Sequence, residues 1–337
     1  MTSLLSLDVQ VERLAFTAPF RISGYVFDGL DCIVATLSDG AHRGRGEGDG
    51  VYYLDDKVPH MLAELQRVRP QIEAGPSREE LRFILPAGGA RNAVDAALWE
   101  LEAKRVGKPV WALAGLEAPR PVVTTFTLGA DEPATMAQAA VAFGAVQAIK
   151  IKLTGDLDLD IARVDAIRAA RPDVWLGVDA NQGFGIGELD ALVAAMTAAR
   201  VSLIEQPLAR GREADLDGYR SPIPIAADES ALTLDDVPGL VGRFDVVNIK
   251  LDKCGGLTEG LMIARAAREA GLGVMVGNMG GSSLSMAPSF VLGQLCDICD
   301  LDGPIFLQQD RQPAIRYDAG EAWCDDDVWG HQACVVA

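Results

Sequence analysis

The feature that most limits the possible folds is a regular alternation of short apolar runs and helical stretches from Pro121 onward. Each run is rich in β-branched residues, which is typical of strands buried on both faces of a parallel sheet, and Ala-rich stretches separate the runs. Eight such units predict a (β/α)₈-type barrel, with a doubly wound open sheet as the alternative. The runs are VVTTFTLG, AIKIKL, WLGVDAN, LIEQPL, PIAADES, VVNIKLDK, GVMVGNM and ICDLDGP.

The residues before Pro121 follow a different pattern. LSLDVQVERLAF and DCIVATLSDG alternate apolar and polar residues, as half-buried antiparallel strands do. Apolar residues at helical spacing follow in 57–73 and in ARNAVDAALWELEAKRVG, where Gly107 is the predicted stop. GRGEGDG, from Gly44 to Gly50, lacks the setting of a dinucleotide site, so we expect a loop there. This part of the chain is therefore predicted to be a small α+β unit.

Polar side chains gather at the carboxyl end of nearly every apolar run. In a barrel, this is the face where the ends of several strands build an active site. The residues are Lys150, Lys152, Asp179, Asn181, Glu205, Asp228, Glu229, Lys250, Asp300 and Asp302.

Three of these acids, Asp179, Glu205 and Asp228, follow one another at intervals of about one βα unit. We therefore expect them on neighbouring strands at similar height. Three carboxylates in a confined site repel one another, and a hard divalent cation such as Mg²⁺ removes that repulsion. Lys152 and Lys250 belong to the second and sixth runs, so their amines should face each other across the barrel mouth.

Lys150 and Lys152 lie two apart in a strand, so both ammonium groups point the same way. Taken alone, such a pair indicates a solvated strand face, but the ordered set of acids on neighbouring strands favours a site. We expect Lys150 to bind substrate oxygen and, together with a metal, to lower the pKa of Lys152 so that it acts as a base. Asp252 and Lys253 follow the sixth run and are predicted to be loop residues.

The net charge of −18 argues against a nucleic-acid or anionic-membrane partner. The start MTSLLSLDVQ has no basic segment followed by a long apolar one, and no apolar run approaches the length of about 20 residues that a membrane span needs. We expect a cytoplasmic protein.

The motifs IKIKL, VDANQGF, IEQPL, ADES and NIKLDKCGGLTEG resemble the enolase superfamily, in its muconate-lactonizing branch. The resemblance implies a modified (β/α)₇β TIM-type barrel with an N-terminal α+β cap domain. It also implies one Mg²⁺ per subunit, held by Asp179, Glu205 and Asp228, and catalytic bases at Lys152 and Lys250.

The predicted domains are a cap of residues 1–118, completed by the segment at about 310–337, and a barrel of residues 119–309. LPAGGARNAVDAALWELEAKR and CDLDGP resemble the dipeptide epimerases more closely, and in that family an Asp-x-Asp pair binds the free ammonium of the substrate. Asp300 and Asp302 occupy those positions.

This resemblance implies an isomerase that transfers a proton at the α-carbon of the C-terminal residue of a dipeptide. The leading substrate is L-Ala-D/L-Glu derived from peptidoglycan, and we expect a homo-oligomer. Substrate contacts are also expected from Arg21, Tyr25 and Phe27 of the cap, which would set the second residue.

Several alternatives stay open at this point. One is an epimerase of other L-Ala-L-Xaa dipeptides with a hydrophobic or cationic second residue. The others are an N-acylamino acid racemase, an o-succinylbenzoate synthase, a muconate-type cycloisomerase and an inactive binding barrel. Asp300 and Asp302 argue against substrates that lack a free ammonium group.

Overall fold

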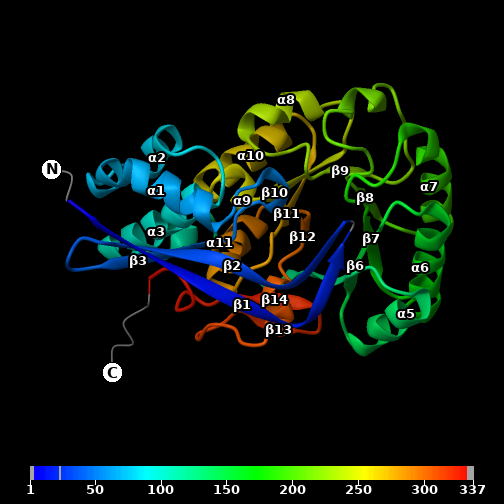
Figure 1. The fold of residues 1–337 in the computed structure, drawn as a ribbon, viewed down its shortest axis with the longest axis horizontal. Helices are drawn as coiled ribbons and strands as arrows, with labels where there is room; N and C mark the ends of the chain where they lie inside the picture. Colours follow the sequence, from blue (N-terminus) through cyan, green and yellow to red (C-terminus); the bar gives the residue numbers. More distant parts are fainter. Residues whose placement is uncertain (1–3, 23, 332–337) are drawn as a thin grey trace.

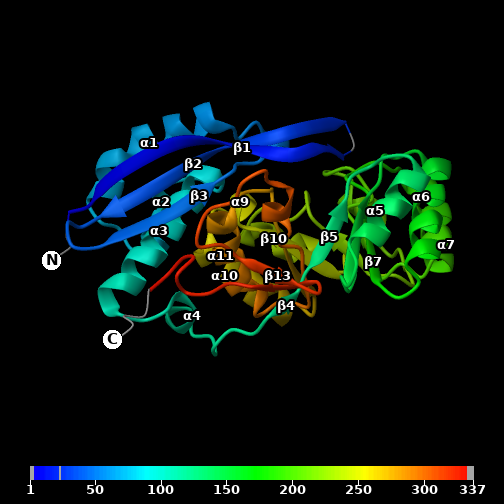
Figure 2. The same ribbon diagram turned by 90° about the horizontal axis from the view of Figure 1, so that it is seen from below.

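The computed structural model describes residues 4–22 and 24–331, and the chain ends included in the predicted domains, 1–3 and 332–337, lie outside this range. An antiparallel sheet with its helices lies against a barrel of parallel strands (Figures 1 and 2). Among the described residues, no helix is both long and apolar enough to cross a membrane.

Every one of the eight predicted apolar runs contributes a strand to one parallel sheet, in the order β12-β11-β10-β9-β8-β7-β6-β5. A single parallel bridge between Thr124 and Cys299 joins the two ends of the sheet, so the barrel is nearly closed. The predicted barrel fold is confirmed, and the open sheet is excluded. The strands are β5 (Thr125–Leu128), β6 (Ala148–Lys152), β7 (Trp175–Asp179), β8 (Leu203–Glu205), β9 (Ile225–Ala227), β10 (Val246–Lys250), β11 (Gly273–Gly277) and β12 (Ile298–Cys299).

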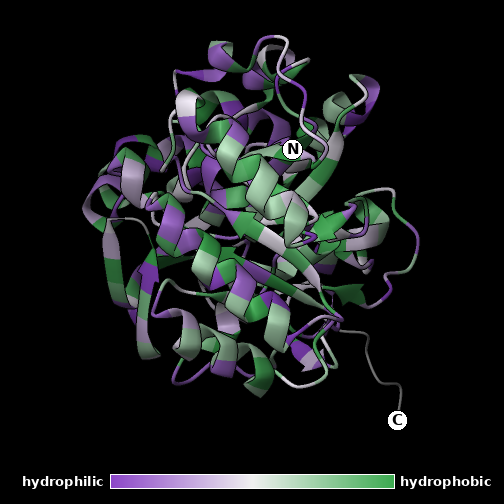
Figure 3. Cartoon of the chain, turned by 90° about the vertical axis from the view of Figure 1, so that its right-hand side faces the viewer, coloured by the Kyte–Doolittle hydropathy of each residue, from purple (hydrophilic) through white to green (hydrophobic). Residues whose placement is uncertain are grey.

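Helices of unequal length surround the barrel, and both polar and apolar residues lie along them (Figure 3). Only short 3₁₀ and α-helical segments follow β8 and β9, whereas full helices follow most other strands. The helical elements are α5 (Pro133–Ala142), α6 (Leu157–Ala170), α7 (Ile186–Ala198), η2 (Glu213–Leu216), η3 (Leu234–Asp236), α8 (Val237–Leu240), α9 (Leu251–Cys254), α10 (Leu257–Glu269), α11 (Ser283–Gly293) and η4 (Gly303–Phe306).

The cap consists of a three-stranded antiparallel sheet and the helices packed on it. A register shift between Ala15 and Phe20 interrupts the long hairpin of the first two strands, whose tip reaches the loop after β5 (Figure 2). There the Ala130 amide donates a hydrogen bond to the Arg21 carbonyl. The elements are β1 (Ser6–Ile22), β2 (Tyr25–Ser38), β3 (Arg43–Gly48), η1 (Tyr52–Leu54), α1 (Val58–Glu73), α2 (Arg78–Ile84), α3 (Gly89–Val106) and α4 (Val110–Leu113).

The prediction of a loop over Gly44 to Gly50 is wrong, because most of this stretch forms β3. Its alternating glycines lie against α3. A Cβ atom at Gly44 would lie only 2.0 Å from the carbonyl oxygen of Ala97, and one at Gly46 only 2.1 Å from that of Ala93. The glycines therefore permit close sheet–helix packing rather than loop flexibility.

The C-terminal part forms a second small antiparallel sheet, in which β13 (Arg316–Asp318) and β14 (Glu321–Trp323) pair with β4 (Val122–Val123). It also reaches the cap, since the Trp329 indole donates a hydrogen bond to the Arg45 carbonyl at 3.0 Å. The segment thus contacts both parts of the chain, and the predicted domain limits remain a prediction.

Candidate active site

Three buried carboxylates lie together at the carboxyl ends of adjacent barrel strands. Asp179 ends β7, Glu205 ends β8 and Asp228 follows β9, and the ligand atoms of the three lie within 4.8 Å of one another. Parallel pairing places Asp179 beside Glu205 in register. The sequence spacing therefore predicted their proximity correctly.

The pKa values of these acids diverge because their neighbours differ. Burial and the charge of Asp179 raise the pKa of Glu205 to about 8. Burial also acts to raise the pKa of Asp179, but Lys152 and Lys150 outweigh it and bring the pKa to about 2. The pKa of Asp228 lies well below its ordinary value, because Lys250 and Lys253 outweigh the effect of burial.

The donor set fits a hard divalent cation. All three ligands are carboxylates, which Mg²⁺ prefers, and they are buried. Glu205 Oε2 is buried and lies 2.7 Å from the Lys150 ammonium group. Three buried carboxylates this close together repel one another, and a divalent cation would supply the positive charge that offsets the repulsion.

Two lysines flank the carboxylate cluster from different strands. Lys152 Nζ lies 2.6 Å from Asp179 Oδ2, and Lys250 Nζ lies 2.7 Å from Asp228 Oδ2. Burial acts to lower the pKa of Lys250, but the Asp228 carboxylate outweighs it and raises the pKa above its ordinary value. Because β6 and β10 are four strands apart in the sheet, the two amines approach the cluster from different sides.

Lys150 lies beneath Lys152 and is almost fully buried. Its Nζ is 2.7 Å from Glu205 Oε2 and 2.9 Å from Asp300 Oδ2. Burial acts to lower its pKa, yet Asp300 and Glu205 raise it well above the ordinary value. Lys150 is therefore a fixed cation between the carboxylate cluster and Asp300.

Asp300 and Asp302 follow β12, and both line the cavity at the barrel mouth. Thr125 Oγ1 donates a hydrogen bond to Asp300 Oδ1 at 2.7 Å, and the Thr127 amide donates one to Asp302 Oδ2 at 2.6 Å. Burial and the nearby charge of Asp300 raise the pKa of Asp302 to about 7. Hydrogen bonds from β5 thus fix one oxygen of each acid, and the raised pKa of Asp302 disfavours its charged form relative to an ordinary carboxyl.

Two family models match the chain. One is described as enolase C-terminal domain-like and covers residues 132–320, and the other is the mandelate racemase / muconate lactonizing enzyme N-terminal domain, over residues 36–115. The chain belongs to the enolase superfamily. The family membership that its sequence motifs indicated is confirmed.

Individual relatives extend this result. The chain is 38% identical over 310 residues to L-Ala-D/L-Glu epimerase of Escherichia coli (strain K12), which covers 92% of this chain and 97% of that protein. It is 42% identical over 242 residues to an N-acetyl-D-glutamate racemase of Pseudoalteromonas sp, covering 72% of this chain and 76% of that protein. A dipeptide epimerase from Methylococcus capsulatus, solved with Mg and L-Arg-D-Lys, matches with a TM-score of 0.88 at 27% identity, over 95% of this chain and 96% of that one.

Asp252 and Lys253 of this enolase-superfamily member are not loop residues as predicted. They lie in α9 and are buried. Lys253 Nζ donates hydrogen bonds to Asp228 Oδ1 at 2.6 Å and to the Asn248 carbonyl at 3.0 Å. The sequence signal that was missed is the helical spacing after β10. Lys253 lies three positions after Lys250, so a single helical turn brings its side chain back to the side of Lys250.

Asp252 connects the barrel to the cap. Its Oδ1 accepts hydrogen bonds from the amides of Asp49 and Gly50, at 2.9 and 3.2 Å. These residues lead into η1, whose tyrosines reach the cavity. The short helix after β10 therefore positions both a candidate metal ligand and a wall of the site.

The three cap residues predicted to contact substrate have different surroundings. Phe27 lines the cavity. Tyr25 does not, is 46% exposed and stacks on Phe27 at 6.0 Å. Arg21 is exposed and outside the lining, because its neighbours Phe20 and Ile22 occupy the cavity face of β1. The structure thus brings together the predicted residues of the barrel and Phe27, but not Arg21 or Tyr25.

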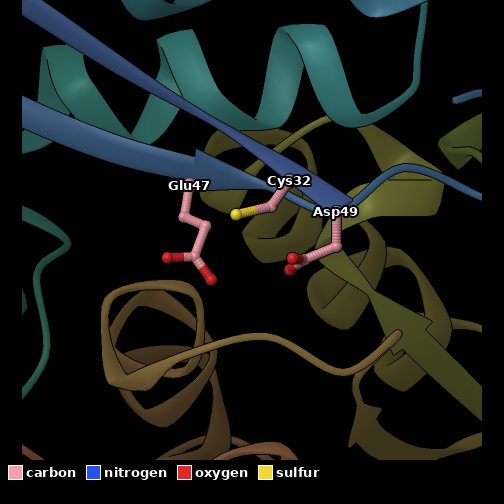
Figure 4. A group of neighbouring side chains, drawn as sticks. All are labelled: Cys32, Glu47 and Asp49. Atoms are coloured by element: carbon pink, nitrogen blue, oxygen red, sulfur yellow. The ribbon is translucent and has the colours of Figure 1, made fainter. Parts of the chain in front are cut away.

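A second group of potential ligands, Cys32, Glu47 and Asp49, lies between the cap sheet and the barrel (Figure 4). Both oxygens of Glu47 are already used: Oε1 accepts from the Ser282 amide at 2.7 Å, and Oε2 lies 2.9 Å from an Arg311 nitrogen. This group therefore holds the cap on the barrel.

Proposed function

We propose that the protein is a Mg²⁺-dependent dipeptide epimerase, which moves a proton between the two faces of the α-carbon in the C-terminal residue of a free dipeptide. The observation that carries the proposal is the position of Lys152 and Lys250 on different sides of one carboxylate cluster. A single base returns a proton to the face from which it came, whereas two bases allow inversion.

Asp179, Glu205 and Asp228 would hold the ion. When bound, Mg²⁺ supplies positive charge beside the substrate carboxylate, which makes the neighbouring α-proton more acidic. Lys152 and Lys250, which now pair with Asp179 and Asp228, would then be released to face the substrate.

The chain's own residues carry the proton transfer. One of the two lysines, in its neutral form, takes the α-proton, and the C–H electron pair is delocalised onto the substrate carboxylate. The opposite lysine, as an ammonium ion, donates a proton to the other face and forms the new C–H bond. Lys150 stays protonated and stabilises the oxygen on which negative charge develops.

Asp300 and Asp302 would bind the ammonium group of the first residue. Both carboxylates line the same cavity as Lys152 and Lys250, which supports binding of an ammonium group near the reacting carbon. The name of the Escherichia coli relative supports a dipeptide substrate.

A racemase of N-acylamino acids is the second candidate. It is favoured by the pairing of Asp300 with Lys150 and Thr125, which already compensates one acid of the pair, and by the name of the Pseudoalteromonas relative. An inactive barrel has no comparable support, since both lysines and all three carboxylates are in place. An o-succinylbenzoate synthase would share these groups, but its substrate has no ammonium group for Asp300 and Asp302 to bind.

One comparison separates the two candidates. Free and N-acetylated L-Ala-L-Xaa dipeptides are incubated with the protein and Mg²⁺ in D₂O, alongside N-acetyl amino acids, and α-deuterium is measured by mass spectrometry. The proposal expects exchange in free dipeptides and a loss of about 10-fold or more on acetylation. Faster exchange in N-acetyl amino acids would identify the racemase.

We further propose that the substrate comes from peptidoglycan and that the enzyme works in the cytoplasm as a homo-oligomer. The free thiols of the described cysteines support a reducing compartment. The proposed boundary between cap and barrel near residue 118 is supported by the first barrel strand, β5, which begins soon afterwards at Thr125.

A further inference from the structure

The active-site cavity has two chemically different halves. The space inside it that the centre of a water-sized sphere can reach is about 120 Å³. The floor carries the charged residues that follow the barrel strands. The roof comes from the cap and is apolar and aromatic, with the contributing side chains Phe16, Phe20, Ile22, Phe27, Tyr52 and Tyr53.

The roof is a packed aromatic surface. Phe27 contacts Tyr52 edge-on with ring centroids 5.2 Å apart, and Tyr52 contacts Tyr53 at the same distance. Phe20 packs at 4.9 Å on Phe306, which reaches the cavity from the barrel side. Such interlocked rings form a preformed apolar wall.

The roof offers no cation to a negatively charged side chain. Lys152 and Lys250 are the only basic residues that line the cavity within the described part of the chain, and both belong to the floor. Arg21 lies outside the lining, and Arg13 is exposed and pairs with Asp28. A glutamate side chain under this roof would be desolvated with no cation beside it and with only tyrosine hydroxyl groups as hydrogen-bond donors from the roof, which is unfavourable for a charged carboxylate.

A cationic side chain is also poorly matched. The acids of the floor lie at the strand ends of the barrel and not in the cap. Asp49 is the single acid that the described cap contributes to the lining, and its Oδ2 accepts a hydrogen bond from Ser285 at 2.9 Å. Burial and the neighbouring Glu47 raise the pKa of Asp49 well above its ordinary value, which disfavours the charged form that would attract a cation.

We propose that this aromatic roof selects a C-terminal residue with an apolar side chain, aromatic or large aliphatic, over glutamate. The inference rests on the proposed function, because it assumes that the α-carbon lies between Lys152 and Lys250 with its side chain toward the cap. It differs from the glutamate substrates in the names of the relatives from Escherichia coli and Pseudoalteromonas.

The test compares kcat/KM for α-deuterium exchange across L-Ala-L-Xaa with Xaa as Phe, Tyr, Leu, Met, Lys and Glu, at constant Mg²⁺. We expect Phe and Leu to exceed Glu and Lys by about 10-fold or more, which corresponds to burial of one apolar side chain. A preference for Glu or Lys of similar size would overturn the inference.

Two variants connect the preference to the roof. Phe27→Arg should change the Phe-to-Glu ratio of kcat/KM by at least about 10-fold in favour of Glu, because it adds a cation to the roof. The matched control is Phe83→Arg, at a phenylalanine of α2 that is 87% exposed, and it should leave the ratio unchanged. An unchanged ratio in Phe27→Arg would contradict the role of the roof.

The same assay separates failure of this inference from failure of the proposed function. If only N-acetyl amino acids exchange, the dipeptide assignment is wrong, but the comparison of N-acetyl-Phe with N-acetyl-Glu still tests the roof. Selection of N-acetyl-Phe would support the roof, and selection of N-acetyl-Glu would overturn it.

Discussion

Lys152 and Lys250 lie four strands apart in the barrel, and each places its ammonium group on a different carboxylate of one cluster, at 2.6 Å from Asp179 and 2.7 Å from Asp228. A planar carbanion bound between them would be open to proton transfer from either side. Each lysine can therefore be removed separately to find the face on which it acts.

Replacing one lysine should separate proton exchange from epimerisation. Lys250→Ala is expected to abolish epimerisation while one epimer of the dipeptide still exchanges its α-proton through Lys152. Lys152→Ala should leave exchange in the other epimer. Proton NMR in D₂O on each pure epimer measures both processes, and epimerisation near the wild-type rate in both variants would exclude the two-base assignment.

The carboxylate cluster should bind a divalent cation in the absence of substrate. Asp228→Asn removes one negative ligand, so we expect the Mg²⁺ dissociation constant from titration calorimetry to rise by at least about 10-fold. Asp217→Asn is the matched control, since Asp217 is 61% exposed and pairs with Arg243 at the surface. Equal affinity in the two variants would place the ion elsewhere.

The affinity for the free ammonium group should depend on pH through Asp302. Its pKa is raised to about 7, so the carboxyl is neutral at lower pH and ionised above, and only the ionised form attracts an ammonium group. KM for a free dipeptide should therefore fall as the pH rises from 6 to 8.

Asp302→Asn removes that titration. We expect a KM about 10- to 100-fold higher at pH 8 and no fall between pH 6 and 8, because a charge-assisted contact is lost. Asp318→Asn, at an exposed acid of β13, should behave as wild type. A pH dependence that persists unchanged in Asp302→Asn would assign it to another group.

Lys253 should stabilise the folded protein strongly. Its ammonium group is buried and bonds Asp228 and two backbone carbonyls, and removing one partner of a buried pair costs about 3–5 kcal/mol. We expect Lys253→Met to lower the free energy of unfolding in urea by about that amount. Lys57→Met, which removes an exposed pair with Asp55, should leave the free energy of unfolding nearly unchanged, because water screens that pair. Similar values for both would show that the buried pair contributes little.

The barrel and its cluster were readable from the sequence because both rest on regular spacing. Each strand run is short, apolar and separated from the next by a helix, so Asp179, Glu205 and Asp228 had to fall on adjacent strand ends. The positions of Lys152 and Lys250 could be predicted in the same way, because they lie in the second and sixth strands of the regular series. These positions depend on the topology rather than on detailed packing.

The features that were missed depend on contacts between distant segments. Gly44 and Gly46 suggested a loop, and only their fit against α3 shows why a strand needs them. Lys253 could be found only by recognising a single helical turn after β10. The orientation of Arg21 depends on where the hairpin tip meets the loop after β5, which local sequence does not specify.

The most direct test of the central claim is the fate of the α-proton in a pure L,L-dipeptide incubated with the protein and Mg²⁺ in D₂O. With L-Ala-L-Phe and L-Ala-L-Glu as probes, the account predicts deuterium at the α-carbon of the second residue together with the L,D-epimer, and loss of both in excess chelator or in the Lys152→Ala, Lys250→Ala double variant. Absence of α-deuterium in every free dipeptide tried, or full turnover in excess chelator, would contradict it.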